Sequence, residues 1–496
     1  MTLVPLDIPA GFYRNGTDLE QAGRWRDGSL VRWRDNSLRP IGGWRERKAS
    51  FSTDPVRGMH TWEAINGNAW LAGGSHSELK VMTGSGTLSD ITPTDLAAGR
   101  EDAAANTGFG GGTYGTGYYG QPIQANDDSV LLEATTWSLD NWGEYLVGCH
   151  YDDGRLLEWQ LNTAANAAPI ANAPIDNLGL VVTEERFIFA LGAGGNSRLV
   201  QWCDFEDNTT WTPSTTNQAG SQELQTNGQI MQGIRTRGQT LIITDTDAFS
   251  ARYSGPPYIY SFSRVGTSCG GISRKAAADV DMGVFWMGQR GFFRFDGNSV
   301  SELPCDVHDY VFGDFNVAQQ SKVWAFANGQ FGEIWWFYCS ADSIEIDRYV
   351  ALDFKEGHWL IGDLARTSGV QRGVFRYPFM AGHDADSDIY DHEVGFNFDS
   401  STAYAETGPI SIGAGDQIAK VTTLIPDEKT QGDVDVTFKT RFYPNEAEVT
   451  HGPFTPANPT SVRFSGRQFR MRVEGQQPTG WRVGTMRVDT TSGGRR

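Results

Sequence analysis

The feature that most constrains the fold is a set of short strand-forming clusters that recur along the first 400 residues. Each cluster is a run of Val, Ile, Leu, Phe or Trp bounded by Gly, Asn or Asp, and successive centres after Leu146 lie 42, 54, 43, 50 and 45 residues apart. Four antiparallel strands with their turns occupy about 40 to 50 residues, the length of one β-propeller blade. The apolar centres are Trp70, Leu146, Ile188, Ile242, Phe285, Trp335 and Met380. They predict an all-β fold in which residues 1–400 form a β-propeller of about seven blades, in a range of six to eight.

The first cluster shows the expected layout of a blade. Residues 68–74 are predicted to form an inner strand, residues 78–83 a second strand and residues 87–91 a third. Apolar residues alternate in these runs, and successive side chains of a strand point to opposite faces of its sheet. We therefore expect the apolar side chains to pack against the neighbouring blades.

One interval is longer than the others, because 76 residues separate Trp70 from Leu146. The excess falls on residues 97–128, a glycine-rich stretch that also carries several aromatic residues. Glycine opposes a fixed fold, whereas aromatic rings offer contact surface. We expect this Gly-rich insertion to be either a flexible arm that orders against a neighbouring molecule or a surface loop without a partner.

After about residue 400 the strands become longer and alternate regularly between apolar and polar residues. Residues 401–489 are therefore predicted to form a separate C-terminal β-sandwich, and residues 490–496 a flexible tail. Pro444, Pro453, Pro456 and Pro459 are placed in a long loop of this domain, because proline suits connections and not central strands. The predicted strands are 408–412, 418–425, 434–443, 462–464, 469–473 and 481–488.

Charge and cysteine content exclude several classes of protein. The net charge of −19 argues against a protein that wraps DNA, because neutralising phosphates requires clustered Lys and Arg. The five cysteines are widely spaced and form no CxxC pair, so reduced and buried thiols are expected. The N-terminus shows no secretory signal pattern and no stretch approaches the roughly 20 apolar residues of a membrane span. The chain is expected to fold in the cytosol.

Two acidic motifs are candidates for chemistry, and each departs from its pattern. Residues 204–211 resemble the Asp-box turn of sialidase propellers, but Glu206 and Asn208 stand where that motif has Asp and Gly. Asp384, Asp386 and Asp388 occupy positions one, three and five of a calcium loop, which lacks the required glycine and the bidentate glutamate. Structural turns are the favoured interpretation of both.

No other pattern in the sequence indicates a reaction. None of the eight histidines has HExxH spacing, and the sequence contains neither a GxSxG elbow nor a GxxxxGK[ST] phosphate loop. We therefore expect no catalytic residue, no cofactor-binding residue and no metal ligand, and we predict that the chain is not an enzyme.

The N-terminal region interleaves tryptophan with arginine. This pattern is compatible with a surface on which nucleic-acid bases stack, but acidic residues interrupt it. Arginines beside tryptophans more often cover aromatic rings on a half-buried sheet and pair with carboxylates, so a core or a subunit interface is favoured. The residues are Trp25, Trp33 and Trp44 among Arg24, Arg26, Arg32, Arg34, Arg39, Arg45 and Arg47.

Several dispersed motifs resemble those of bacteriophage virion proteins of the tail hub or nozzle, the family of tail tubular protein B. The longest is the opening stretch DGSLVRWRDNSLRPIGGW at residues 27–44. The others are WSLDNWG at 137–143, FDGN at 295–298, IYDHE at 389–393, GRQFRMRV at 466–473 and WRVG at 481–484. Together they span nearly the whole chain.

This resemblance implies a structural subunit of a virion tail, assembled in the cytoplasm of a host bacterium. Its partners would be further copies of itself in a ring, expected to be a hexamer, together with a head-to-tail adaptor and tail fibres or other tail proteins. DNA would pass through the lumen without sequence-specific binding. The family supplies no cofactor and no catalytic residue.

A salt-dependent contact between subunits follows as a further hypothesis. Four arginines of the sandwich would meet acidic side chains of an adjacent subunit. The arginines are Arg463, Arg467, Arg470 and Arg472, and the acidic residues are Asp127 and Asp128.

Two functions of other classes stay open at the level of sequence. Sixteen tryptophans and the approximate Asp box are compatible with a glycan-binding or glycan-cleaving β-propeller of a virion, since sugars stack on exposed aromatic rings. A propeller that acts as an interaction scaffold in a cell is the other. Paired carboxylates in a pocket would favour the glycan hypothesis.

Overall fold

The computed structural model describes residues 2–105, 131–383, 387–411, 417–476 and 478–492. Within these ranges the chain forms 42 strands and little helix: α1 (His308–Gly313), η1 (Ala193–Gly195) and η2 (Val317–Lys322). None of the helices in the described part is long and apolar enough to cross a membrane. The all-β prediction is confirmed.

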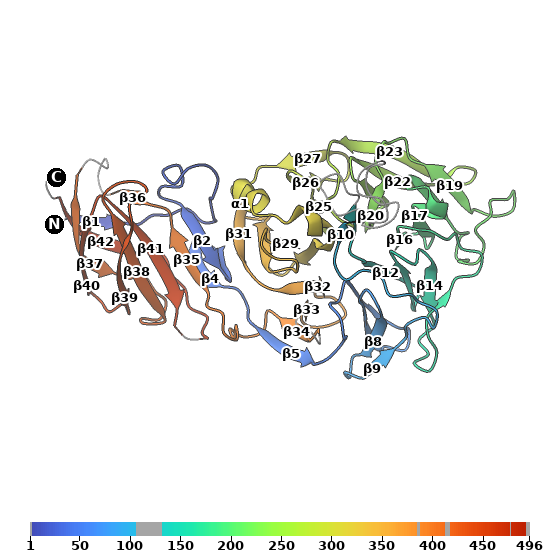
Figure 1. Cartoon of the computed structure of the whole chain (residues 1–496), viewed down its shortest axis with the longest axis horizontal. Helices are drawn as coiled ribbons and strands as arrows, with labels where there is room; N and C mark the ends of the chain where they lie inside the picture. The colour runs from blue at the N-terminus through green and yellow to red at the C-terminus, as the bar shows by residue number, and fades with distance from the viewer. Residues whose placement is uncertain (1, 106–130, 384–386, 412–416, 477, 493–496) are drawn as a thin grey trace, which may run out of the picture.

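Seven four-stranded antiparallel sheets surround one axis and make a closed β-propeller (Figure 1). The innermost strands β6, β12, β16, β20, β24, β28 and β32 contact one another in ring order, and β32 returns to β6. The predicted number of blades is therefore confirmed. The first blade consists of β6 (Gly58–Glu63), β7 (Ala69–Gly74), β8 (Leu79–Thr83) and β9 (Leu88–Asp90), and the second of β12 (Trp137–Trp142), β13 (Tyr145–His150), β14 (Leu156–Trp159) and β15 (Ala168–Pro169). The third blade consists of β16 (Gly179–Val182), β17 (Ile188–Leu191), β18 (Leu199–Trp202) and β19 (Gly220–Glu223). The fourth consists of β20 (Ile230–Thr236), β21 (Gln239–Thr244), β22 (Asp247–Gly255) and β23 (Ile259–Thr267).

The seventh blade closes the ring with a strand from the other end of the chain. Its outer strand β5 comes from the N-terminal region and pairs with β34, with Trp44 opposite His392 and Arg45 opposite Asp391. The fifth blade consists of β24 (Ala277–Val280), β25 (Gly283–Met287), β26 (Phe292–Phe295) and β27 (Val300–Leu303). The sixth consists of β28 (Trp324–Asn328), β29 (Glu333–Tyr338), β30 (Arg348–Asp353) and β31 (His358–Asp363). The seventh consists of β32 (Arg366–Val370), β33 (Phe379–Gly382), β34 (Ile389–His392) and β5 (Trp44–Lys48).

The position of the strands within the first blade corrects the sequence expectation. Residues 68–74 form the second strand β7 and not the inner strand, which is β6. The second strand lies between two others and is buried along most of its length, so it carries the continuous apolar run. The inner strand β6 includes His60 and Thr61, which are only partly buried, and it therefore lacks that signal.

The C-terminal domain is a sandwich of two antiparallel sheets. Its core includes Val421, Leu424, Val436, Phe438 and Phe464, which are all buried. One sheet has the order β1 (Thr2–Pro5), β42 (Arg487–Ser492), β37 (Ala419–Ile425) and β40 (Thr460–Gly466). The other has the order β2 (Trp25–Ser29), β35 (Tyr404–Thr407), β41 (Gln468–Gly475), β38 (Val434–Arg441) and β39 (Val449–Phe454), and β36 (Ile410–Ser411) also pairs with β41.

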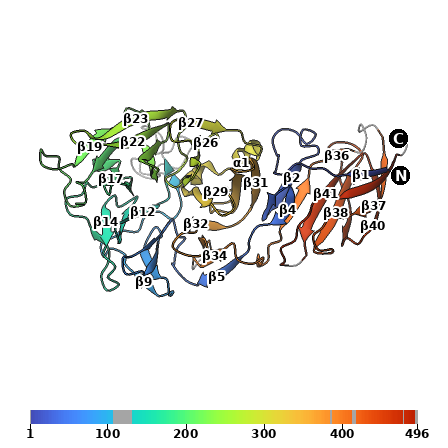
Figure 2. The same ribbon diagram turned by 180° about the vertical axis from the view of Figure 1, so that it is seen from behind.

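The expected domain boundaries need correction at both ends of the chain. Strands β1 and β2 belong to the sandwich and not to a propeller of residues 1–400, because β1 pairs with β42 and β2 pairs with β35. Residues 490–492 belong to β42 and not to a flexible tail. Strand β39 occupies part of the expected proline loop and includes Pro453, an edge-strand position that proline tolerates. Both chain ends lie at the end of the sandwich farthest from the propeller (Figure 2).

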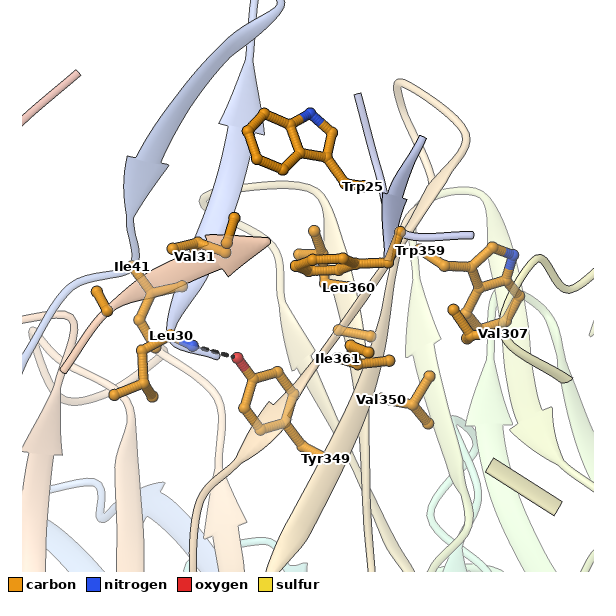
Figure 3. Close-up of a cluster of buried hydrophobic side chains, with 14 of the residues drawn as sticks. Trp25, Leu30, Val31, Ile41, Val307, Tyr349, Val350, Trp359, Leu360 and Ile361 are labelled. Atoms are coloured by element: carbon orange, nitrogen blue, oxygen red, sulfur yellow. Dashed lines mark hydrogen bonds between the residues drawn. The ribbon is translucent and has the colours of Figure 1, made fainter. Parts of the chain in front are cut away.

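The two domains share one hydrophobic core. A single cluster of buried side chains includes propeller residues of β29 to β31 and sandwich residues of β37, β38 and β41. The N-terminal segment fills the junction: Trp25, Val31 and Ile41 lie near Leu360 and Val350 of the sixth blade (Figure 3). The backbone amide of Leu30 donates to the Tyr349 hydroxyl at 3.0 Å. The hairpin of β3 (Val31–Arg34) and β4 (Ser37–Pro40) lies beside this junction.

Candidate functional site

The propeller axis holds a cavity of about 390 Å³. Six of the seven inner strands line it, and its polar residues are Asp140, Arg235, Asp279 and Gln371. The Asp140 carboxylate accepts a hydrogen bond from the Val182 amide at 2.9 Å, which fixes it between the second and third blades.

Lys275 and His60 add two titratable groups that act electrostatically on this region. Burial lowers the pKa of Lys275 to about 8, although Asp140 opposes the shift. Burial likewise lowers the pKa of His60, whose Nε2 lies 3.0 Å from Asn141 Oδ1. The polar side chains that line the cavity offer both donors and acceptors to a polar ligand.

The opposite end of the axis is covered by the connection between the first two blades. Residues 99–105 and 131–135 of this connection, which we call the axial plug, include the paired strands β10 (Ala104–Ala105) and β11 (Leu131–Leu132). In Figure 1, β10 lies inside the ring of blades. The Gln319 side chain of η2 donates to the Ala103 carbonyl at 3.1 Å and accepts from its amide at 3.0 Å. The plug therefore reaches the sixth blade. The rest of the expected insertion, residues 106–128, lies outside the described residues.

Buried ion pairs hold the axial plug and its surroundings together. Lys322 pairs with Asp102, and Arg274 of the fifth blade pairs with Glu133 while its guanidinium lies 3.8 Å from the ring centre of Tyr151. A third pair joins Arg57 to Glu345, with Nη1 and Oε1 2.8 Å apart.

Neighbouring cations keep Glu345 of this network charged. Burial alone would raise the pKa of Glu345, but Arg57 and Lys322 hold it at about 2. The paired residues bridge the first, second, fifth and sixth blades. This network of ion pairs was not predicted from the sequence. The available signal was an isolated charge in an apolar setting, such as Arg57 after Val56.

The Asp-box-like segment forms a turn between β18 and β19. Asp204 accepts from the amides of Phe205 and Gln218, and Asp207 accepts from the amide and hydroxyl of Thr209. Hydrogen bonds from Thr209 lower the pKa of Asp207. Trp211 is buried and donates to the Asn208 carbonyl at 2.7 Å. These contacts fit the structural interpretation.

The predicted calcium-loop residues are only partly described. Asp384 and Asp386 lie outside the described residues, whereas Asp388 accepts from the Ser50 amide at 2.8 Å. A different group has potential ligand atoms within 4.8 Å of one another, namely Asp353, Glu356 and His358. Arg34 lies 3.4 Å from Asp353 and 3.9 Å from Glu356, so a guanidinium already supplies positive charge there.

The N-terminal tryptophans belong to the core that the two domains share, whereas Arg45 and Arg47 lie on the outer strand β5 of the seventh blade. Trp25, Trp33 and Trp44 are buried, so their faces are not available for base stacking. Arg32 is also buried and donates to Glu333 and to Glu393, each at 3.0 Å. The structure thus supports the core interpretation of this segment.

The C-terminal arginines are largely engaged within the chain. Arg470 is buried and lies 3.0 Å from Glu448 and 2.6 Å from Asp18. Arg472 pairs with Glu474 at 2.9 Å and lies over the Tyr404 ring. These two are not available to a neighbouring subunit as the sequence hypothesis requires. The proposed acidic residues Asp127 and Asp128 lie outside the described residues.

Comparisons with known proteins add only distant structural likenesses. No family model and no curated protein sequence matches the chain. Virginiamycin B lyase from Staphylococcus aureus has a TM-score of 0.43 and 7% identity, covering 71% of this chain and 98% of that protein. The N-terminal domain of Nup159 has a TM-score of 0.36 and 10% identity, covering 74% of this chain and 99% of that domain.

Proposed function

We propose that this chain is a structural subunit of a bacteriophage tail nozzle or hub ring, which forms the channel for genome ejection and a platform for other tail proteins. The observation that carries the proposal is that three of the motifs resembling this family, although far apart in the sequence, meet at the domain junction. Arg32 of the first motif binds Glu393 of the IYDHE motif, and Leu38 pairs with Val483 of the WRVG motif.

The junction suits a mechanical role. Motif residues 27–44 pass from the sandwich through the β3–β4 hairpin to β5, which closes the propeller. Because the two domains share one core, force on either domain is transmitted without a hinge between them. A wall subunit that must hold a channel open requires this kind of stiffness.

The path of DNA in such a ring would lie between subunits. The axial plug covers one end of the propeller axis, so the lumen would be enclosed by several copies and not by one propeller. Each copy carries a net charge of −19, which disfavours adhesion of a passing duplex. The adaptor and fibres would bind the outer faces.

Electron microscopy of the purified full-length protein tests this proposal, with particle masses measured at low and high salt. We expect closed rings, most simply hexamers, with a lumen wide enough for duplex DNA. Of the four C-terminal arginines, Arg463 is exposed, so Arg463→Gln should weaken any salt-dependent contact most directly. Dispersed monomers at every concentration, especially with glycan-hydrolysing activity, would overturn the proposal.

A further inference from the structure

A second pocket, of about 260 Å³, lies at the domain junction. It is separate from the axial cavity and is formed by the β3–β4 hairpin, the segment after β34 and the segment that leads to Val483. Four of its lining residues are arginines: Arg32, Arg34, Arg39 and Arg482. One acidic residue, Glu393, also lines it, so arginines outnumber carboxylates in the lining although the protein is acidic overall.

Two of the arginines are committed to carboxylates of the propeller. Arg32 binds Glu333 and Glu393, and Arg34 lies between Asp353 and Glu356. The Arg32 guanidinium also lies 3.7 Å from the ring centre of Phe331, which forms part of the wall. These contacts fix one side of the pocket.

Arg39 and Arg482 are different. In the described part of the chain neither has a carboxylate within ion-pair distance. Arg39 donates to the Arg34 carbonyl at 3.0 Å, and its buried Nε has no acceptor there. Burial first, and then the neighbouring Arg482, lower the pKa of Arg39. The antiparallel bridge between Leu38 and Val483 places Arg39 opposite Arg482. Two guanidinium groups, one from the hairpin and one from the segment before β42, are therefore neighbours without a matching anion, an arrangement that an anion between them would stabilise.

We propose that this pocket binds a small multivalent oxyanion of the phosphate or polycarboxylate class. The planar guanidinium fork matches two oxygens of such a group, and Arg39 of the hairpin and Arg482 of the segment before β42 supply one fork each. Gly395 and Gly480 line the pocket and are exposed. The volume suits a group of a few heavy atoms and not a drug-sized ligand. Since the anion would join the hairpin to the sandwich, its binding stabilises the junction.

Isothermal titration calorimetry on the full chain tests this binding, with sodium pyrophosphate and sodium citrate as separate probes and ionic strength held constant with sodium chloride. Arg39→Gln and Arg482→Gln each remove one fork and should weaken binding roughly tenfold or more, as expected for loss of charge-assisted hydrogen bonds. Arg487→Gln is the matched control, because Arg487 is an exposed arginine of the same domain that does not line the pocket.

Thermal unfolding provides an independent readout. The preferred anion should raise the unfolding temperature of the wild type and of Arg487→Gln, but not of a variant with both forks removed. Without anion, Arg39→Gln should unfold no earlier than the wild type, because it relieves repulsion from Arg482. Arg39→Lys keeps the charge without the fork and should bind with intermediate affinity. Binding of pyrophosphate alone assigns the phosphate class, and binding of citrate alone the carboxylate class. The absence of saturable binding, or equal affinity in all variants, overturns the inference.

Discussion

Arg32 shows how a single residue joins the N-terminal hairpin to the propeller. It stands on the β3–β4 hairpin, yet its partners Glu333 and Glu393 come from the sixth and seventh blades. The three charged side chains are largely removed from water. Each carboxylate also accepts a hydrogen bond from another donor, Glu333 from the Trp335 indole N–H and Glu393 from the Gly42 amide. A buried ion cluster of this kind is expensive to break, because removing one partner leaves uncompensated charge behind.

Replacing Arg32 with methionine should therefore destabilise the protein strongly. Two buried carboxylates lose their cation, which corresponds to a cost of about 3–5 kcal/mol. Arg186→Met is the matched control, since Arg186 pairs with Glu206 at the surface, where both side chains are about half exposed; an exposed pair contributes about 0–1 kcal/mol. Calorimetric unfolding of both variants measures how much unfolding free energy each substitution removes. Equal losses would show that the cluster is not the main stabilising contact of the hairpin.

The same variant should show a defined pH dependence. Burial raises the pKa of Glu333 in the native protein although Arg32 opposes the shift, and loss of Arg32 raises it further. A carboxyl group whose folded pKa exceeds its unfolded pKa favours the folded state at low pH and loses that contribution as pH rises through the folded pKa. The deficit of Arg32→Met relative to wild type should accordingly be smaller at pH 5.5 than at pH 8. A deficit independent of pH would contradict this assignment.

At the scale of elements, local pattern was enough to find the second strand of each blade. All seven apolar centres lie on these strands, from Trp70 on β7 to Met380 on β33, because a strand buried on both faces needs a continuous apolar run. Inner strand β6 was misplaced because it faces a polar axis. Strands β1, β2 and β5 were assigned to the wrong partners or missed, since pairing between the two ends of the chain leaves no local signature.

The same limit applied to the candidate sites. The residues at 206 and 208 were enough to favour a structural turn over an Asp box. The axial plug and the arginine pocket were not foreseen, because each combines residues such as Asp102 and Lys322, or Arg39 and Arg482, that are far apart in sequence. Only closure of the ring and pairing of the termini bring them together.

The axial plug yields a prediction about the Gly-rich insertion. Ala105 pairs with Leu131, so the two ends of residues 106–130 are already adjacent strands. Replacing these residues with a short Asn-Gly turn should preserve the fold and leave the unfolding temperature nearly unchanged, because the strand pairing and the Ala103 and Lys322 contacts are retained. If the insertion is an arm that binds a neighbouring subunit, the shortened protein stays folded but no longer forms rings. A large fall in unfolding temperature would show instead that the removed residues stabilise the propeller itself.

At the scale of the whole molecule, the chain begins in the sandwich, then forms the whole propeller, and ends in the sandwich again. Strands β1 and β2 are built first, β5 then enters the seventh blade, and the remaining sandwich strands follow only after the propeller is finished. The segment that enters the propeller and the segment that leaves it lie side by side at the junction, where the Trp44 amide donates to the Asn397 carbonyl at 3.1 Å. The propeller strands all lie within residues 44–396, whereas the sandwich combines strands from both ends of the chain, and one apolar core extends across both domains. We therefore expect a single cooperative unfolding transition.

Dissection at the junction tests this arrangement. A fragment of residues 397–496 should not fold, because each of its sheets loses an edge strand and Trp25 is missing from the core. A fusion of residues 1–43 to residues 397–496 through a short Gly-Ser linker restores both strands, and the proximity of Gly43 to Asn397 makes that linker feasible. Circular dichroism and thermal unfolding should show a cooperative β-structure for the fusion and not for the fragment. Residues 44–396 retain β5 and should form a closed propeller that unfolds at a lower temperature than the full chain, since the surface around Leu360 becomes exposed. If residues 397–496 fold cooperatively alone, the N-terminal strands are dispensable, and the stiffness attributed to the shared junction loses its physical basis.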